Sequence, residues 1–224
     1  MRIVTWNMAR RSQEAGWTYL VNEIKPDIAL LQEVRPPTSF MGANLLYERI
    51  GDSRNWGSAI YVRGFPIHDV KIEKYRGWVV ACEILLPNNS SLVAISIHAQ
   101  IINNYVFPNL KNIFSDISPF LQERRFIVGG DLNSCRLIDK VYGTKYHNEF
   151  FDSIESGGFF NCHRMFHAEE QQTVWSWNTK YPYQDDHLFV SESLKEQLLS
   201  CDVLDNEHIR KLSDHSPVIA EVCI

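Results

Sequence analysis

The sequence predicts an α/β fold in which two mixed β-sheets pack face to face with helices on their outer faces. Three observations favour it. β-branched apolar runs of strand length recur along the 224 residues, amphipathic helical segments lie between some of them, and several neighbouring runs are close enough to form hairpins. A chain of this length with 45% hydrophobic residues can build a large core. No linker or repeat divides it, so we expect one domain over residues 1–224.

The N-terminal half predicts mainly strands. Residues 2–7, RIVTWN, are typical of a buried strand. Residues 12–24 carry apolar side chains at helical spacing before Pro26, which predicts a helix. Further strands are expected at residues 28–34, 45–50, 58–62, 68–74, 78–86 and 92–98. A Pro-Asn-Asn-Ser turn separates the last two, which indicates a hairpin.

The C-terminal half alternates helices with strands. Residues 109–121 have the apolar positions of an amphipathic helix, and a strand follows at 125–128. A helix is expected at 148–155, ending before Gly157 and Gly158. Three more strands are expected at residues 173–177, 186–190 and 216–222.

Composition limits the class of protein. No run of 18 apolar residues and no signal peptide occurs, so we expect no membrane span and a cytoplasmic location. The five cysteines are scattered and lack a C-x-x-C pair, which indicates neither a disulfide framework nor a zinc site. A formal charge of −5 argues against a strongly basic surface that coats nucleic acid, while leaving a phosphate-bearing substrate open.

Polar residues gather where apolar runs end, and they are the strongest functional signal. They are Asn7, Glu33, Asp131, Asn133, Asp186, Asp214 and His215. Carboxylates brought together at strand ends repel one another and resist desolvation unless a cation compensates. Oxygen ligands without thiolates favour Mg²⁺ over zinc. The alternative interpretation is turn and capping chemistry, which Asp and Asn also favour.

Seven short motifs occur in a consistent order: TWN at 5–7, LQEV at 31–34, GSAIYVRGFPI at 57–67, SIH at 96–98, GGDLN at 129–133, DHLFVS at 186–191 and SDHSPV at 213–218. Together they resemble the endonuclease/exonuclease/phosphatase superfamily. The resemblance implies a four-layer αββα sandwich of the DNase I type, with the active site at one end of the two sheets. It also implies hydrolysis of phosphate esters with Mg²⁺, or with Mn²⁺ in its place.

The resemblance further implies a role for each polar residue. Glu33 would be the principal metal ligand, with Asn7 and Asp214 close by. Asp131 would orient or deprotonate the attacking water, and Asn133 would hold a phosphate oxygen. His215 would contact the phosphate or act as an acid or base.

Asp186 would orient His215, although Asp185 beside it leaves the strand register open. His98 would contact the scissile phosphate or assist the leaving group. Gly77 stands where related nucleases pair such a histidine with a glutamate, which puts the acid role of His98 in doubt.

Several residues beyond these clusters are candidates for substrate binding. Arg10, Arg11, Arg35 and Arg136 each follow a polar strand end, which indicates a basic collar around the acidic centre, or else ordinary surface arginines. Trp177 belongs to an aromatic segment that could stack nucleobases or form a half-buried strand.

The sequence supports three functions. The first is a metal-dependent nuclease acting on DNA or RNA. The second is a phosphatase or phosphodiesterase of a smaller ester, such as a nucleotide, a phosphoinositide, a phospholipid headgroup or a tyrosyl-DNA adduct. The third is a binding domain that kept the fold and lost turnover. The collar and the aromatic segment favour the nuclease.

Overall fold

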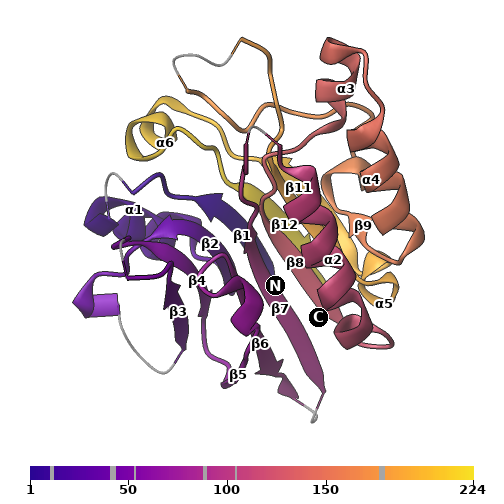
Figure 1. The fold of residues 1–224 in the computed structure, drawn as a ribbon. Coiled ribbons are helices and arrows are strands. Elements are labelled where there is room, and N and C mark those ends of the chain that lie inside the picture. The colour runs from indigo at the N-terminus through magenta and orange to yellow at the C-terminus, as the bar shows by residue number, and fades with distance from the viewer. Residues whose placement is uncertain (11–12, 41–43, 53, 88–89, 104, 177–179) are drawn as a thin grey trace.

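Two six-stranded mixed sheets form the centre of the molecule (Figure 1). The computed structural model describes residues 1–10, 13–40, 44–52, 54–87, 90–103, 105–176 and 180–224. The first sheet has the order β11 (Leu198–Val203), β12 (Val218–Val222), β1 (Arg2–Asn7), β2 (Ile28–Val34), β4 (Gly57–Val62), β3 (Leu45–Arg49). The second has the order β5 (Ile67–Val70), β6 (Val79–Leu85), β7 (Ser91–His98), β8 (Phe126–Asp131), β10 (Asp186–Val190), β9 (Phe160–Asn161).

Each sheet contains one parallel pair, and this sets where the strands end. β1 runs parallel to β2, and β7 runs parallel to β8. The other pairings are antiparallel. Parallel neighbours finish at the same edge of a sheet, so residues at their C-terminal ends come together.

Helices cover both outer faces (Figure 1). On the first sheet lie α1 (Gln13–Tyr19), its π-helical continuation Leu20–Ile24, and α6 (Glu207–Leu212). On the second lie α2 (Phe107–Leu121) and α4 (Tyr146–Ser156). Short helices α3 (Arg136–Tyr142) and α5 (Glu192–Lys195) and the 3₁₀ turns Thr38–Phe40, Glu73–Tyr75 and His163–Met165 complete the described elements.

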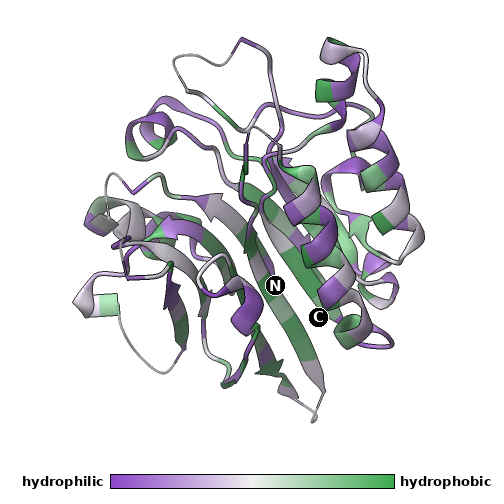
Figure 2. Ribbon diagram, viewed as in Figure 1, coloured by the Kyte–Doolittle hydropathy of each residue, from purple (hydrophilic) through white to green (hydrophobic). Residues whose placement is uncertain are grey.

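Strand alternation divides the apolar side chains among three layers of core. Ile3, Leu30 and Leu188 point between the sheets, whereas Val4 and Leu31, one residue further along β1 and β2, point toward α1. Successive strand residues face opposite sides, so a strand covered on both sides must be apolar throughout. Figure 2 shows this as green strands beneath helices with purple outer faces. The four-layer αββα sandwich is confirmed.

Most predicted strands are confirmed, including the hairpin of β6 and β7. The strand expected at 68–74 was too long, because β5 ends at Val70 and a 3₁₀ turn follows in which the Tyr75 hydroxyl donates to Asp116. The helix expected at 12–24 breaks into α1 and a π-helical turn, and residue 12 lies outside the described residues.

The strand expected at 173–177 was wrong for its described part. Val174 forms only an isolated bridge with His215, and the Trp175 indole nitrogen donates to Ser216 Oγ at 2.8 Å. The sequence analysis did not predict β9, β11, α3, α5 or α6. No helix among the described residues combines the length and apolar character needed to cross a membrane.

Candidate active site

Strand register brings three of the predicted residues together. β7 and β8 pair His98 with Asp131, and β10 begins with Asp186 opposite the same Asp131. Cα partners on neighbouring strands point to the same face, so these side chains meet at one end of the second sheet. Asn7 ends β1 of the other sheet, and its Nδ2 donates to Asp131 Oδ2 at 2.9 Å. The two sheets are therefore joined at the site by a buried hydrogen bond.

Glu33 reaches the same place through an irregularity in β2. The register of β2 against β4 shifts between Leu31 and Val34, and Glu33 has a φ of +52°. A bulge of this kind re-aims a side chain. Arg10, Asn103 and Asn133 also have φ between +49° and +60°. Such conformations cost about 1–3 kcal/mol each for residues other than glycine, and they cluster at functional sites.

His215 is held by Asp186. Its Nδ1 lies 2.8 Å from Asp186 Oδ2, and Asp186 is fully buried. Burial lowers the pKa of His215, but the charge and hydrogen bond of Asp186, with the charges of Asp131 and Asp214, outweigh it and raise the pKa to about 10. The ring is therefore protonated at neutral pH, and its Nε2 lies 4.0 Å from Asp131 Oδ2.

Asp186, and not Asp185, faces His215. The Asp185 carbonyl oxygen accepts from the Leu132 amide at 2.8 Å, and burial raises the pKa of its carboxyl to about 8, with Asp131 and Asp186 adding to the rise.

His98 is a buried neutral histidine. Its Nε2 lies 3.7 Å from Asp131 Oδ2 and 3.8 Å from Glu33 Oε1, and its Nδ1 has no hydrogen-bond partner among the described residues. Burial lowers its pKa to about 4, against the charge of Asp131, which raises it. The rings of Trp56 and Trp78 pack against it, with centroids 5.7 and 5.1 Å away.

Gly77 cannot supply the carboxylate that related nucleases place beside this histidine. Its φ is +75°, and a Cβ there would lie 2.6 Å from the backbone of Arg49. Any side chain at this position would collide with a main chain that cannot yield cheaply. The indole of Trp78, one residue before β6, packs against His98 instead.

Asn133, Asp214 and Glu33 are the remaining predicted residues of the acidic centre. Asp131 Oδ1 accepts from the Asn133 amide at 2.9 Å, and one N–H of the Asn133 side chain donates to the Ala99 carbonyl at 2.9 Å. The Asp214 carbonyl accepts from the Trp175 amide at 2.7 Å. Burial raises the pKa of Glu33, and the charge of Arg10 opposes this while Asp131 and Asp214 add to it.

The acids therefore disfavour one another's ionisation, which a cation would relieve. Among the described residues, no three His, Cys, Asp or Glu side chains are arranged as a metal cage. Mg²⁺ does not need one, because it keeps several waters and binds through one or two carboxylates plus substrate oxygens. Glu33, with Asn7 and Asp214 nearby, fits this requirement.

A cleft of about 570 Å³ opens over these groups. Seven predicted residues line it: Asn7, Arg10, Glu33, His98, Asp131, Asn133 and His215. Asp186 lies beneath His215. The sequence interpretation missed Arg54, Trp56, Trp78 and residues 99–103, which form the walls. No motif marks them, because they come from β-strand ends and loops that are far apart in the chain.

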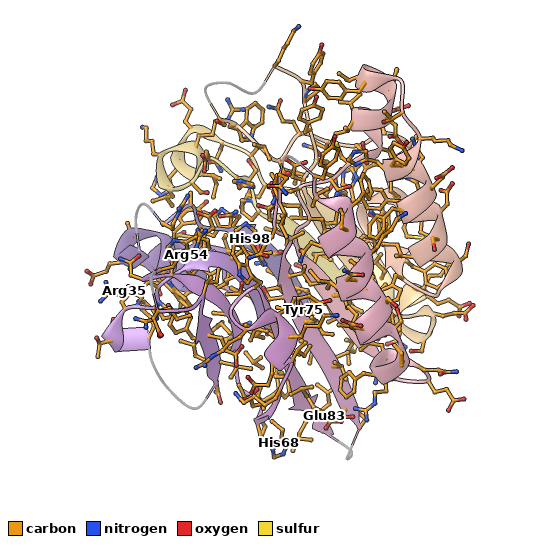
Figure 3. The ribbon with its side chains drawn as sticks, in the orientation of Figure 1. Arg35, Arg54, His68, Tyr75, Glu83 and His98 are labelled. Atoms are coloured by element: carbon orange, nitrogen blue, oxygen red, sulfur yellow. The ribbon has the colours of Figure 1, made fainter. Side chains whose placement is uncertain are left out.

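The predicted substrate-binding residues separate. Arg10 lines the cleft, and its Nε bonds Glu33 Oε2. Arg35 is exposed and does not line the cleft, and Figure 3 shows it farther from His98 than Arg54. Arg136 pairs with Asp152 at 2.7 Å and Glu155 at 3.2 Å on α4. Neither Arg35 nor Arg136 lines the cleft, so Arg10 is the one described arginine of the predicted collar that does. Arg11 and Trp177 lie outside the described residues.

Comparisons with known proteins find solved structures that have the same fold as this chain. No family model and no curated protein matches the sequence. The 3′ phosphatase NExo from Neisseria, bound to a product DNA hairpin, matches with a TM-score of 0.76 and 19% identity over 100% of both chains. An AP endonuclease from Archaeoglobus fulgidus matches with a TM-score of 0.74 and 17% identity over 100% of both chains. A humanized D. rerio TDP2 matches with a TM-score of 0.67 and 14% identity over 98% of this chain and 97% of the other. At these identities the likeness establishes the fold alone.

Proposed function

We propose that this chain, which has the DNase I-like fold of the endonuclease/exonuclease/phosphatase proteins, is a divalent-metal-dependent phosphodiester hydrolase that cleaves nucleic acid. One observation carries the proposal. Asp131 stands within 4.0 Å of a neutral His98 and a protonated His215 and accepts a hydrogen bond from Asn7. An acceptor and a cationic donor that converge in one cleft are what water attack on a phosphate ester needs.

Glu33 would hold Mg²⁺, with Asn7 and Asp214 completing its surroundings, and Mn²⁺ would substitute. When bound, the ion would polarise a phosphoryl oxygen and neutralise charge that develops there. Arg10 forms an ion pair with Glu33. Arg10 would therefore release Glu33 to the metal and become free for the substrate.

Asp131 would orient the attacking water and take its proton. Its Oδ1 and Oδ2 are fixed by the Asn133 amide and the Asn7 side chain, so the carboxylate has one orientation. Fixing the acceptor before substrate arrives removes an entropic cost from the reaction.

His215 would donate through Nε2–H to a non-bridging phosphate oxygen, since Asp186 occupies Nδ1 and keeps the ring protonated. Asn133 would add a second donor with its remaining side-chain N–H. His98 is neutral, and its Nδ1 has no hydrogen-bond partner among the described residues, so it would contact the phosphate as a hydrogen-bonding group and would not serve as general acid.

A second candidate is hydrolysis of a smaller phosphate ester. It is favoured by the same cleft, in which Arg10 and Arg54 are the only arginines among the described lining residues. A long polymer would be served better by more basic groups than these two.

The test incubates wild type and Asp131→Asn with Mg²⁺ and labelled single- and double-stranded DNA, RNA, or bis(p-nitrophenyl) phosphate, with EDTA as the metal control. We expect cleavage of a polynucleotide that EDTA and Asp131→Asn abolish. Asp152→Asn removes a carboxylate that pairs with Arg136 on the outside, and it should cleave normally. Turnover of the small ester alone would favour the second candidate, and cleavage that survives Asp131→Asn would reject this site.

A further inference from the structure

Arg54 is an uncompensated cation on the wall of the cleft. It lines the cleft with Arg10, yet among the described residues no carboxylate forms a salt bridge with it. Other arginines of the described chain do pair with a carboxylate: Arg49 pairs with Asp52, and Arg63 pairs with Asp27. A cation without a partner beside a catalytic centre is available for an anionic ligand.

Two tryptophans hold this guanidinium in place. Arg54 Cζ lies 4.9 Å from the Trp56 ring centroid and 5.3 Å from that of Trp78. The two rings meet edge to face, 84° apart with centroids separated by 5.8 Å. Cation–π contacts of this kind orient the guanidinium while leaving its N–H donors free, which an ion pair with a carboxylate would not.

The position relates Arg54 to the reacting groups. Trp56 and Trp78 both pack against His98, and the charge of Arg54 helps to lower the pKa of that histidine. Figure 3 shows Arg54 on the side of His98 that faces Arg35. Arg54 is thus separated from the Asp131 centre by a layer of aromatic side chains. That offset suits a phosphate next to the scissile one and not the scissile phosphate itself.

We propose that Arg54, held over Trp56 and Trp78, is a binding site for a phosphate adjacent to the scissile phosphate, so that the cleft selects esters with at least two phosphates in a chain. The inference rests on the proposed function, because it names the part of the substrate that the same cleft would bind. It assigns Arg54 a role in selecting substrate, while Asp131 and His215 act on the ester.

The first measurement is binding without turnover. A fluorescein-labelled single-stranded oligonucleotide is titrated with wild type, Arg54→Ala, Arg54→Lys and Arg49→Ala in EDTA at several salt concentrations, followed by anisotropy. For Arg54→Ala we expect affinity about fivefold lower at low salt and a slope of log K against log salt smaller by roughly 0.7, the value for one phosphate contact on a single strand. Arg54→Lys should keep part of the affinity, because it keeps charge but loses the planar stacking.

Arg49→Ala is the matched control, since Arg49 is an exposed arginine that already pairs with Asp52. It should leave affinity and slope unchanged. An Arg54→Ala protein that matches wild type in both, or an Arg49→Ala protein that loses as much, would overturn the inference. Failure of wild type to bind any oligonucleotide would overturn it too.

The second measurement separates this inference from the proposed function. KM is measured on an oligonucleotide and on thymidine 5′-monophosphate p-nitrophenyl ester, which has a single phosphate. Arg54→Ala should raise KM about fivefold on the oligonucleotide alone, with kcat unchanged on both. Normal cleavage with equal KM for wild type and Arg54→Ala would reject the phosphate site and keep the hydrolase. Oligonucleotide binding that depends on Arg54, without cleavage of any substrate, would keep the phosphate site and reject the hydrolase.

Discussion

His215 Nδ1 lies 2.8 Å from Oδ2 of Asp186, and the other oxygen of that buried carboxylate has no hydrogen-bond partner among the described residues. The histidine is therefore the main compensation for a charge taken completely out of water. Such a pair is strongly interdependent, since removing one partner leaves the other charge buried alone. Asp186 holds His215 in one orientation and one protonation state, and this dependence can be measured.

Asp186→Asn should lower the pKa of His215 from about 10 toward its ordinary value of 6.5, because the charge that raises it is gone. His215 would then lose its proton as pH rises past neutrality. We expect kcat to fall by roughly 10²–10⁴-fold at pH 8 and to recover partly toward pH 6, whereas wild type stays active across that range. NMR titration of the His215 ring checks the pKa directly. An unchanged pKa in Asp186→Asn would contradict this account.

Glu33→Gln should abolish stabilisation by Mg²⁺. A ligand that binds only the native state raises the free energy of unfolding by about 2.7 kcal/mol at a concentration of 100 times its Kd. Wild type should therefore show a Tm that rises with MgCl₂, and Glu33→Gln a Tm that does not. Glu196→Gln changes an exposed carboxylate that does not line the cleft, and it should respond like wild type. A wild type that ignores Mg²⁺ and Mn²⁺ would favour a binding domain without turnover.

The ends of strands were easier to predict from the sequence than the contacts between them. Apolar runs end at Asn7 and Asp131 and begin just after Asp186, so the local hydrophobic pattern marks these three strand ends. The pairing of His98 with Asp131 depends on the register between two strands, which no local pattern carries. The same holds for Arg54, whose place is set by two tryptophans that come from different parts of the chain.

Elements were missed where the local signal was weak. α6 has six residues, and the side chain of its N-cap residue, Asn206, accepts from the Ile209 amide at 2.9 Å. That cap is the signal which could have revealed it. β11 is an edge strand with a bulge between Leu198 and Ser200, so its alternation is interrupted. In the described part of the strand expected at 173–177, Trp175 lies in a loop and packs under Arg210, whose Cζ is 3.6 Å from the indole ring centroid.

Gly130→Ala should disrupt the second sheet at the strand that carries Asp131. Gly130 has a φ of +150°, and a Cβ there would lie 1.7 Å from the Ile97 carbonyl oxygen on the neighbouring strand. The parallel strands would have to separate, so we expect destabilisation of about 3 kcal/mol or more in urea unfolding. Gly158→Ala is the control: its φ is +90°, but nothing lies within 4 Å of the added carbon. It should cost only about 1–3 kcal/mol of backbone strain. Equal losses in the two variants would show that the collision does not matter.

His163 should make the protein less stable in mild acid. It is almost fully buried, and burial lowers its pKa to about 4, with the charge of His167 adding to the fall. The unfolded chain takes up a proton near pH 6.5 while the folded chain does not, so the contribution of His163 is complete above pH 6.5. It is lost as pH falls from 6.5 toward 4, by at most about 1.4 kcal/mol per pH unit.

His163→Phe keeps a ring beside His167, whose centroid is 4.3 Å away, and cannot take a proton. Urea unfolding between pH 4 and 7 should therefore show a flatter pH dependence for His163→Phe than for wild type. His68→Gln, at an exposed histidine on β5, should follow wild type, and a His163→Phe curve parallel to wild type would refute the prediction.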